Sequence, residues 1–228
     1  MDLRDKGVLI TGGGTGAGRA IALALAAEGC QVGITGRREE KLQETAGLNS
    51  HEPTIQFLPA DVSDRDEVQR LFDWAAEKIG PINILVNSAG INVKKRATKD
   101  LSPEDFDRLI RINCTGADNT ITSVLPQMRN RQDGLIININ SIAGLRASLL
   151  AGVGYSAAKF AMTALARGFA NEEGDNGIRL TTIFPGEINT PILDERPEPV
   201  SDQRKASLLQ LNQHQLLRQQ QRRRRDAE

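Results

Sequence analysis

Short apolar runs alternate with longer segments whose apolar positions recur at helical spacing along most of the chain. The apolar runs predict strands over residues 7–11, 31–35, 54–58, 82–86, 135–140 and 178–184. The longer segments predict helices over residues 19–28, 38–46, 64–79, 103–128 and 154–172. Such alternation is typical of an α/β protein with a doubly wound, Rossmann-like parallel sheet. We expect residues 1–195 to form a single dinucleotide-binding and catalytic domain.

The last part of the chain breaks this pattern. Residues 208–228 are dominated by Gln and Arg and contain no apolar run at their end. We therefore expect residues 196–228 to be an atypical polar tail, and the strand over 178–184 to lie at the edge of the sheet with unpaired backbone groups and an uncovered apolar face.

Composition excludes several functional classes. The 29 basic and 29 acidic residues balance, so no global charge draws the chain to nucleic acid or to an anionic membrane. The run Arg222–Arg225 is typical of a solvated tail, and we expect no nucleic-acid binding and no metal site. Cys30 and Cys114 lie in apolar patterns and predict two buried thiols. The first six residues lack a signal-peptide core and no apolar run approaches a membrane span, which predicts a cytoplasmic location.

A glycine-rich turn follows the first predicted strand and opens directly into a helix. Its sequence, Thr11-Gly12-Gly13-Gly14-Thr15-Gly16-Ala17-Gly18, allows positive φ and a close approach of the backbone to a pyrophosphate. The helix N-terminus adds free N–H groups and a positive dipole end. A plain tight turn is the alternative, but this position favours dinucleotide binding by Gly12, Gly14, Thr15, Gly16 and Gly18.

The end of the second predicted strand bears on the choice between NAD and NADP. NAD-binding proteins usually carry an acidic residue there for the ribose 2′-hydroxyl. This chain has Thr35-Gly36-Arg37-Arg38, and two guanidinium groups attract a 2′-phosphate. The sequence favours NADP, with NAD as the alternative if Arg37 and Arg38 only open a charged surface helix.

Four polar side chains are candidates for catalysis. Tyr155 and Lys159 are four residues apart and share one face of a predicted helix, where the ammonium group would lower the pKa of the phenol. Ser141 follows an apolar strand at the sheet edge where ligands bind. Asn113 continues the buried stripe of Phe106, Leu109 and Ile110 and therefore needs a structural or a functional partner. A helix-surface pair, a turn serine and a structural hydrogen bond are the respective alternatives.

Together these motifs resemble the short-chain dehydrogenase/reductase family, in its short single-domain branch, over residues 3–195. The matching residues are the glycine turn, Asp61-Val62, Asn87-Ser88-Ala89-Gly90, Asn113, Ser141, Tyr155 with Lys159, Pro185-Gly186 and Thr190. Ser88 replaces an Asn that is common in the family, which is a small change. The tail is the larger departure, and we expect it to weaken folding or assembly more than chemistry.

The resemblance implies a role for each matching residue. Tyr155 would be the general acid in reduction and the base in oxidation, Lys159 would lower its pKa and hold the nicotinamide ribose, and Ser141 would orient the substrate oxygen. Asn113 would anchor a water that leads protons to Lys159. The cofactor would also contact Asp61, Val62, Asn87, Ala89, Gly90, Pro185, Gly186 and Thr190.

The predicted function is hydride transfer between NADP(H) and a secondary alcohol or carbonyl compound. A cofactor-binding regulatory or scaffold protein with reduced or lost activity is the alternative, because of the altered tail. Residues Ile91, Asn92, Ile142, Leu145, Ser148 and Leu149 are predicted to border a moderately apolar substrate pocket. By analogy with the family, we expect a homodimer or homotetramer, formed through the helices that carry Asn113 and Tyr155. The small residues Ala157, Ala158, Ala161 and Ala164 would permit close packing of those helices.

Overall fold

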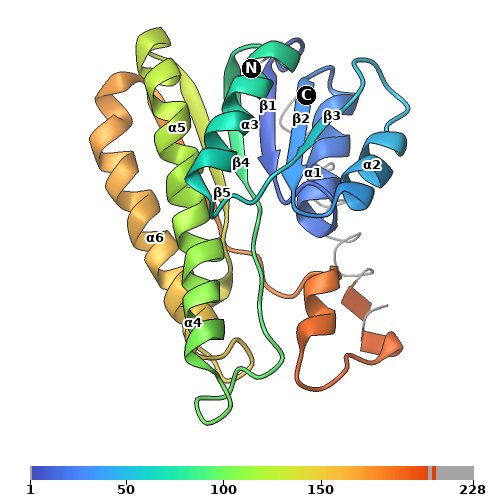
Figure 1. Cartoon of the computed structure of the whole chain (residues 1–228), viewed down its shortest axis with the longest axis vertical. Coiled ribbons are helices and arrows are strands. Elements are labelled where there is room, and N and C mark those ends of the chain that lie inside the picture. The colour runs from blue at the N-terminus through green and yellow to red at the C-terminus, as the bar shows by residue number, and fades with distance from the viewer. Residues whose placement is uncertain (1, 205–206, 209–228) are drawn as a thin grey trace, which may run out of the picture.

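A parallel sheet forms the centre of the molecule in the computed structural model, which describes residues 2–204 and 207–208. Its strands are β1 (Gly7–Thr11), β2 (Gln31–Gly36), β3 (Gln56–Pro59), β4 (Ile82–Asn87), β5 (Gly134–Ile139) and β6 (Ile178–Ile183). The six strands lie in the order β3-β2-β1-β4-β5-β6, which confirms the predicted doubly wound sheet (Figure 1). The order reverses between β1 and β4, and a crevice for a ligand opens at such a switch point, beyond the carboxyl ends of the strands.

Helices connect successive strands and cover the sheet. They are α1 (Gly16–Ala27), α2 (Glu39–Gly47), α3 (Arg65–Lys78), α4 (Pro103–Ile110), α5 (Gly116–Arg131) and α6 (Val153–Glu173). Figure 1 shows α4, α5 and α6 gathered on one side of the molecule and α1 and α2 on the other. The start of α4 follows its sequence signal, because the Ser102 side chain accepts a hydrogen bond from the Asp105 N–H and Pro103 is the first helical residue.

The single helix predicted over residues 103–128 is interrupted in the structure. Between α4 and α5 lies a π-helical turn, η1 (Arg111–Thr115), which contains Asn113. The Asn113 side chain donates a hydrogen bond to the Leu109 carbonyl, 2.9 Å away, inside this turn. One extra residue per turn re-aims the side chains that follow, and such π-turns are frequent at functional sites. Cys114, in the same turn, is only partly buried, so the prediction of two buried thiols is confirmed for Cys30 alone.

Two apolar cores lie on opposite faces of the sheet. One packs α3 and α5 against the strands through Leu71, Phe72, Ile121 and other buried side chains. The second packs α1 and α2 against the other face, with Ala22, Ala26 and Leu42 at its centre. This second core is well buried over β1 and β2. Over β5 the side chains of Leu135, Ile137 and Ile139 are only partly buried.

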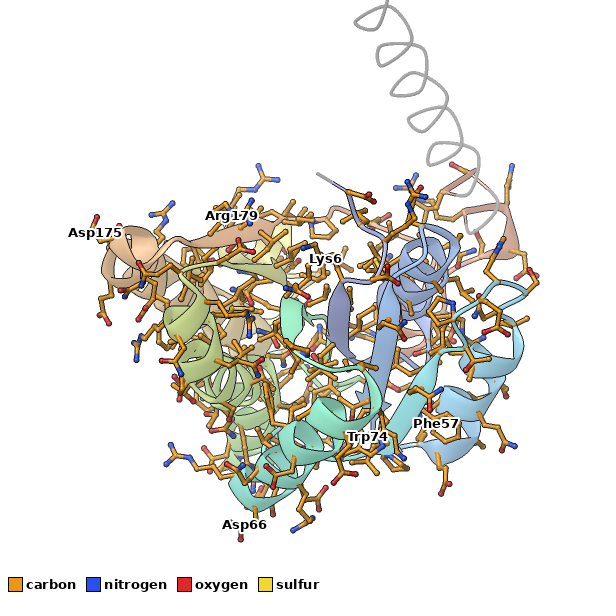
Figure 2. The ribbon with its side chains drawn as sticks, turned by 90° about the horizontal axis from the view of Figure 1, so that it is seen from above. Lys6, Phe57, Asp66, Trp74, Asp175 and Arg179 are labelled. Carbon is orange, nitrogen blue, oxygen red and sulfur yellow. The ribbon has the colours of Figure 1, made fainter. Side chains whose placement is uncertain are left out.

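The β6 strand is an edge strand, as the sequence predicts. Among the described residues no strand follows it, and Ile183 at its end is 47% exposed. Figure 2 places Asp175 and Arg179 at this edge and Phe57 at the opposite, β3, edge. Beyond β6 the chain forms a short 3-10 turn, η4 (Pro191–Glu195). The Gln- and Arg-rich residues 209–228 lie outside the described residues.

Candidate active site

A cavity of about 590 Å³ opens beyond the carboxyl ends of the strands. Its walls come from the glycine turn, the segments after β2, β3, β4 and β5, the first turns of α6, and the segment around η4. Of the residues selected from the sequence, it is lined by Gly12, Gly14, Thr15, Gly16, Arg37, Arg38, Asp61, Val62, Ala89, Gly90, Ser141, Tyr155, Lys159, Pro185, Gly186 and Thr190. Residues far apart in the sequence therefore share one cavity.

The glycine turn has the backbone geometry that its sequence predicts. Gly12 has φ +67°, and a Cβ there would lie 2.8 Å from the backbone of Ala89. Gly18 does not line the cavity, but a Cβ there would lie 2.3 Å from the Gly12 carbonyl oxygen. Gly18 thus permits close packing of helix and strand, and Gly12 permits close approach of two loops. The first turn of α1 contains no acidic residue. No carboxylate of this helix turn therefore offsets the positive end of the helix dipole at the cavity.

Arg19 stabilises this turn from behind, a role that the sequence did not reveal. Its Nη2 and Nε atoms donate to the Gly14 carbonyl at 2.6 and 3.0 Å, and Nε also donates to Thr45 Oγ1 at 2.9 Å. An ion pair of 3.0 Å with Glu44 holds the guanidinium on α2. The turn is therefore fixed between two helices. No motif at the sequence level singles out a polar residue that acts on a backbone carbonyl.

The Arg37 and Arg38 side chains follow β2 and are exposed beside the cavity. Arg38 Nη2 lies 3.5 Å from Thr15 Oγ1, which brings its charge next to the glycine turn. Glu39 and Glu40 begin α2, and neither is among the lining residues. On the other side, Asp61 accepts hydrogen bonds from the backbone and hydroxyl of Ser63 at 2.9 and 2.8 Å. These bonds fix the loop that presents Val62.

Tyr155 lies in the first turn of α6, directly opposite Ser141 at the end of β5. The helix begins after Gly152, whose φ of +81° lets the chain turn sharply into it. The Ser141 hydroxyl accepts a hydrogen bond from the Ala143 N–H at 3.1 Å, which orients it in the turn η2 (Ile142–Gly144). Ser141 and Tyr155 line the same cavity, and Ser141 is near enough to oppose the rise in the pKa of the phenol. The segment after β5 and the first turn of α6 thus bring Ser141 and Tyr155 into the same cavity.

The electrostatics of Tyr155 differ from the sequence prediction. Burial raises the pKa of the Tyr155 phenol above its usual value, and the groups that oppose this are the Ser141 hydrogen bond and the positive charge of Arg96. Lys159 instead lies across the ring, with Nζ 5.7 Å from the ring centroid. At this position the ammonium group acts on the ring face more than on the hydroxyl oxygen.

Lys159 itself is a buried cation. Its side chain is 3% exposed, and Nζ donates to the Ile139 carbonyl at 3.3 Å and contacts the Met162 sulfur at 3.8 Å. Burial lowers the pKa of Lys159 from 10.5 to about 8. The amine is therefore mostly protonated at neutral pH, and it changes protonation state within the range where many enzymes work.

The Asn113 carboxamide is fully used by the backbone. Its Oδ1 accepts from the Ile91 N–H at 3.1 Å, and its Nδ2 donates to the carbonyls of Ile91 and Leu109 at 3.0 and 2.9 Å. It does not line the cavity, but a Cβ at Gly90 would lie 2.9 Å from Asn113 Oδ1 and 3.6 Å from Lys159 Nζ. Asn113 thus fastens the loop after β4 beside Lys159, which is the structural role left open by the sequence.

Comparisons with known proteins agree with this geometry. The family model of short chain dehydrogenases matches residues 6–201. The chain belongs to the short-chain dehydrogenase/reductase family. An uncharacterised oxidoreductase of Staphylococcus saprophyticus is 37% identical over 194 residues, which cover 84% of this chain and 82% of that protein. A second, from Staphylococcus aureus, is 35% identical over 190 residues, covering 83% and 81%.

Among solved structures, a crystal structure of levodione reductase is similar, with a TM-score of 0.79 and 36% identity. The match covers 83% of this chain and 74% of that one. The fold and the family predicted from the sequence are therefore both confirmed, and the chain is an oxidoreductase of the short-chain dehydrogenase/reductase family.

Within this short-chain dehydrogenase/reductase, Asn87 lies behind the cavity wall. Its Nδ2 donates to Asn138 Oδ1 at 3.0 Å, its Oδ1 accepts from Thr120 Oγ1 at 2.7 Å, and the residue is 2% exposed. It is absent from the cavity lining, and its direct contact with the cofactor stays a prediction. Asn87 links β4, β5 and α5 instead.

The substrate end of the cavity is partly as predicted. Ile91, Asn92, Ile142 and Ser148 line it. Leu145 and Leu149 do not, and they are 53% and 99% exposed because the loop between η2 and α6 turns them outward. The sequence prediction missed Arg96, a cavity-lining arginine that is only 6% exposed.

The described residues include no helix long and apolar enough to span a bilayer.

Proposed function

We propose that this chain is an NADP(H)-dependent reductase or dehydrogenase that interconverts carbonyl compounds and secondary alcohols. The observation that carries the proposal is the convergence of Ser141, Tyr155 and Lys159 on the cavity that also receives the glycine turn. A proton donor and a dinucleotide-binding turn in one cavity are what a hydride-transfer enzyme requires.

The residues present fit a nicotinamide dinucleotide. Gly12 and Gly16 have positive φ angles of +67° and +56°, which favour glycine. Because glycine has no Cβ, no side chain fills the space beside the α1 N-terminus at these two positions. The turn and helix would hold the pyrophosphate, Asp61 and Val62 the adenine, and Lys159 and Thr190 the nicotinamide half. When bound, the dinucleotide supplies or accepts the hydride at the substrate carbon.

The chain's own residues manage the proton. In reduction, the Tyr155 hydroxyl donates its proton to the substrate oxygen while the Ser141 hydroxyl holds that oxygen. The raised pKa of Tyr155 keeps the phenol protonated and ready to donate at neutral pH. In oxidation the same oxygen must accept a proton, and the positive charge of Arg96 then favours the phenolate.

The preference for NADP rests on the charge at the end of β2. Arg37 and Arg38 line the cavity where the adenosine ribose would lie, and the nearest acidic residues in sequence, Glu39 and Glu40, do not. A 2′-phosphate would be attracted there, whereas no carboxylate from this segment is placed to accept a bond from a ribose hydroxyl.

Turnover assays test the proposal directly. NADPH and NADH oxidation would be followed against a panel of ketones and aldehydes, with Tyr155→Phe as the matched variant. We expect NADPH-dependent turnover that falls by about 100-fold or more in the variant, while cofactor binding is retained. Cofactor binding without turnover across the panel would favour the regulatory or scaffold function, and full activity of the variant would refute the assigned acid/base.

We also propose that the protein self-associates through α4 and α6. Phe106 on α4 is 37% exposed, and Val153 and Phe160 on α6 are 49% and 44% exposed. Of the small residues predicted to allow close helix packing, Ala158 is fully buried within its own subunit. Sedimentation of the wild type and of Phe160→Glu would distinguish a dimer or tetramer from a monomer.

A further inference from the structure

Arg96 is a buried guanidinium that holds three segments of the cavity wall together. Its Nε donates to the Val93 carbonyl at 2.8 Å within its own loop after β4. Its Nη1 donates to the Leu150 carbonyl at 2.9 Å, in the loop that leads into α6. Its Nη2 donates to the carbonyl of Glu195, at the end of η4. All three partners are backbone oxygens, so the contacts depend on the arginine and not on the identity of its partners.

The packing around Arg96 is as close as its hydrogen bonding. A Cβ at Gly152 would lie 2.7 Å from Arg96 Cβ and 2.9 Å from the Arg96 carbonyl oxygen. Gly152 immediately precedes α6, the helix that carries Tyr155. Arg96 is thus in contact with the residue from which the catalytic helix begins, and it bonds to a carbonyl 99 positions later in the chain.

The segment reached by Nη2 covers the cavity. Ile188, Pro191, Ile192 and Leu193 from this segment line it, and the segment, orange in Figure 1, lies beyond the carboxyl ends of the strands. Its backbone makes local hydrogen bonds, from the Leu193 N–H to the Thr190 carbonyl at 3.0 Å and from the Arg196 N–H to the Leu193 carbonyl at 3.2 Å, and the Arg196 side chain pairs with Glu187. The bond from Arg96 Nη2 to the Glu195 carbonyl adds a contact from the loop after β4 to this segment.

Charge gives Arg96 a second effect. Arg96 and Tyr155 line the same cavity, and Arg96 packs against Gly152, three residues before Tyr155, so its positive charge opposes the effect of burial on the pKa of that phenol. The other groups that face this region are Ser141 and Lys159 on the Tyr155 side, and Glu195 and Arg196 on the Arg96 side. Arg196 is itself paired with Glu187 at 2.6 Å, and Cys114 lies near Lys159.

We propose that Arg96 is a positioning residue that fastens the segment covering the cavity to the start of α6 and presents a buried positive charge to Tyr155. The second half of this proposal rests on the proposed function, in which Tyr155 is the acid/base. The first half is a statement about the molecule without substrate. Both halves have readouts that do not need turnover.

Hydrogen exchange tests the fastening. Amides of residues 192–196 and 148–152 would be followed at pH 7 in the wild type, in Arg96→Met, and in Lys95→Met, which removes a neighbouring exposed charge. We expect exchange in both segments to be about tenfold faster or more in Arg96→Met and unchanged in Lys95→Met. Equal protection in the wild type and Arg96→Met would overturn the fastening role.

A spectroscopic titration tests the charge. Tyr155 is the only tyrosine in the chain, so tyrosinate absorbance reports its ionisation alone, with Tyr155→Phe as the blank. We expect Arg96→Met to raise the midpoint by about half a pH unit or more, and Arg96→Lys to keep it near the wild-type value because the charge remains. Circular dichroism at each pH restricts the comparison to folded protein.

Arg96→Lys separates the effect of the hydrogen bonds from the effect of the charge. It also serves as a second variant if Arg96→Met does not fold. It keeps the charge but cannot place donors on three carbonyls in the planar arrangement of a guanidinium. We expect faster amide exchange at residues 192–196 with an unchanged tyrosine midpoint. A midpoint that is the same in Arg96→Met and the wild type would overturn the electrostatic role. A chain that shows both effects but no turnover would contradict the proposed function and leave the role of Arg96 intact.

Discussion

Replacing Lys159 by Met should make the protein more stable and remove its activity. Lys159 is 3% exposed, and burial lowers its pKa from 10.5 to about 8. The difference of about 2.5 pH units corresponds to ~3 kcal/mol of free energy spent on keeping the amine charged inside the fold. Met has a similar length and no charge, and the neighbouring side chain, Met162, offers it an apolar contact.

The sign of the effect fixes its pH dependence. The folded-state pKa of Lys159 lies below its unfolded value, so the unfolded state binds the proton more tightly. The destabilisation is complete below a pH of about 8 and fades as the pH rises toward 10.5. The advantage of Lys159→Met should therefore be ~3 kcal/mol at pH 7 and about 1 kcal/mol smaller at pH 9.

Urea denaturation at both pH values measures these quantities, and a thermal melt at pH 7 should show a rise in Tm of about 6 to 12 °C. Lys99→Met, an exposed lysine, controls for the loss of a charge and should change stability by less than about 0.5 kcal/mol. A Lys159→Met protein that is less stable than the wild type at pH 7 would refute the reasoning. So would a stability difference that does not depend on pH.

Further predictions concern the cofactor end of the cavity. Gly12→Ala places a methyl group 2.8 Å from the Ala89 backbone at a positive φ, so it should cost about 1–3 kcal/mol in unfolding free energy and weaken NADPH binding measured by fluorescence. Gly168→Ala, in the interior of α6 with no heavy atom within 4 Å of the new Cβ, should instead raise stability by up to about 1 kcal/mol. Arg38→Glu should lower the ratio of kcat/KM with NADPH to that with NADH by about tenfold or more, and an unchanged ratio would exclude Arg38 as the 2′-phosphate contact.

The sequence predicted most of the fold because its signals are local and repeated. Apolar runs gave each strand within two residues at its start, and Ser102 and Gly29 marked the ends of helices where the structure has them. The π-turn at residues 111–115 was missed, and Asn113 within it bonds to the Ile91 carbonyl, a contact between residues too far apart in the sequence for any periodicity to encode. The buried stripe in the sequence therefore identified Asn113 but not the π-turn that contains it.

The site was predicted residue by residue where a motif carried it and missed where only three-dimensional contact does. The glycine turn, Ser141, Tyr155 and Lys159 converge on one cavity as expected. Arg19 and Arg96 act on backbone carbonyls, and such acceptors leave no mark in the sequence of the partner segment. Leu145 and Leu149 were assigned to the pocket by proximity in sequence, and the turn at η2 directs them to solvent.

Two buried cations beside one phenol make an arrangement that stability alone does not favour. Lys159 and Arg96 are 3% and 6% exposed, and their hydrogen bonds go to backbone carbonyls, which stabilise a charge less than a carboxylate does. Burial lowers the pKa of both groups, which shows that desolvation outweighs the local attraction at each site. The Tyr155 phenol gains from the Arg96 charge, which lowers the free energy of its ionised form in a cavity that otherwise raises its pKa, while Lys159 lies over the ring face. Neutralising Arg96 should therefore change the ionisation of Tyr155, which the loss of a purely structural arginine would not do, and neutralising Lys159 should raise stability.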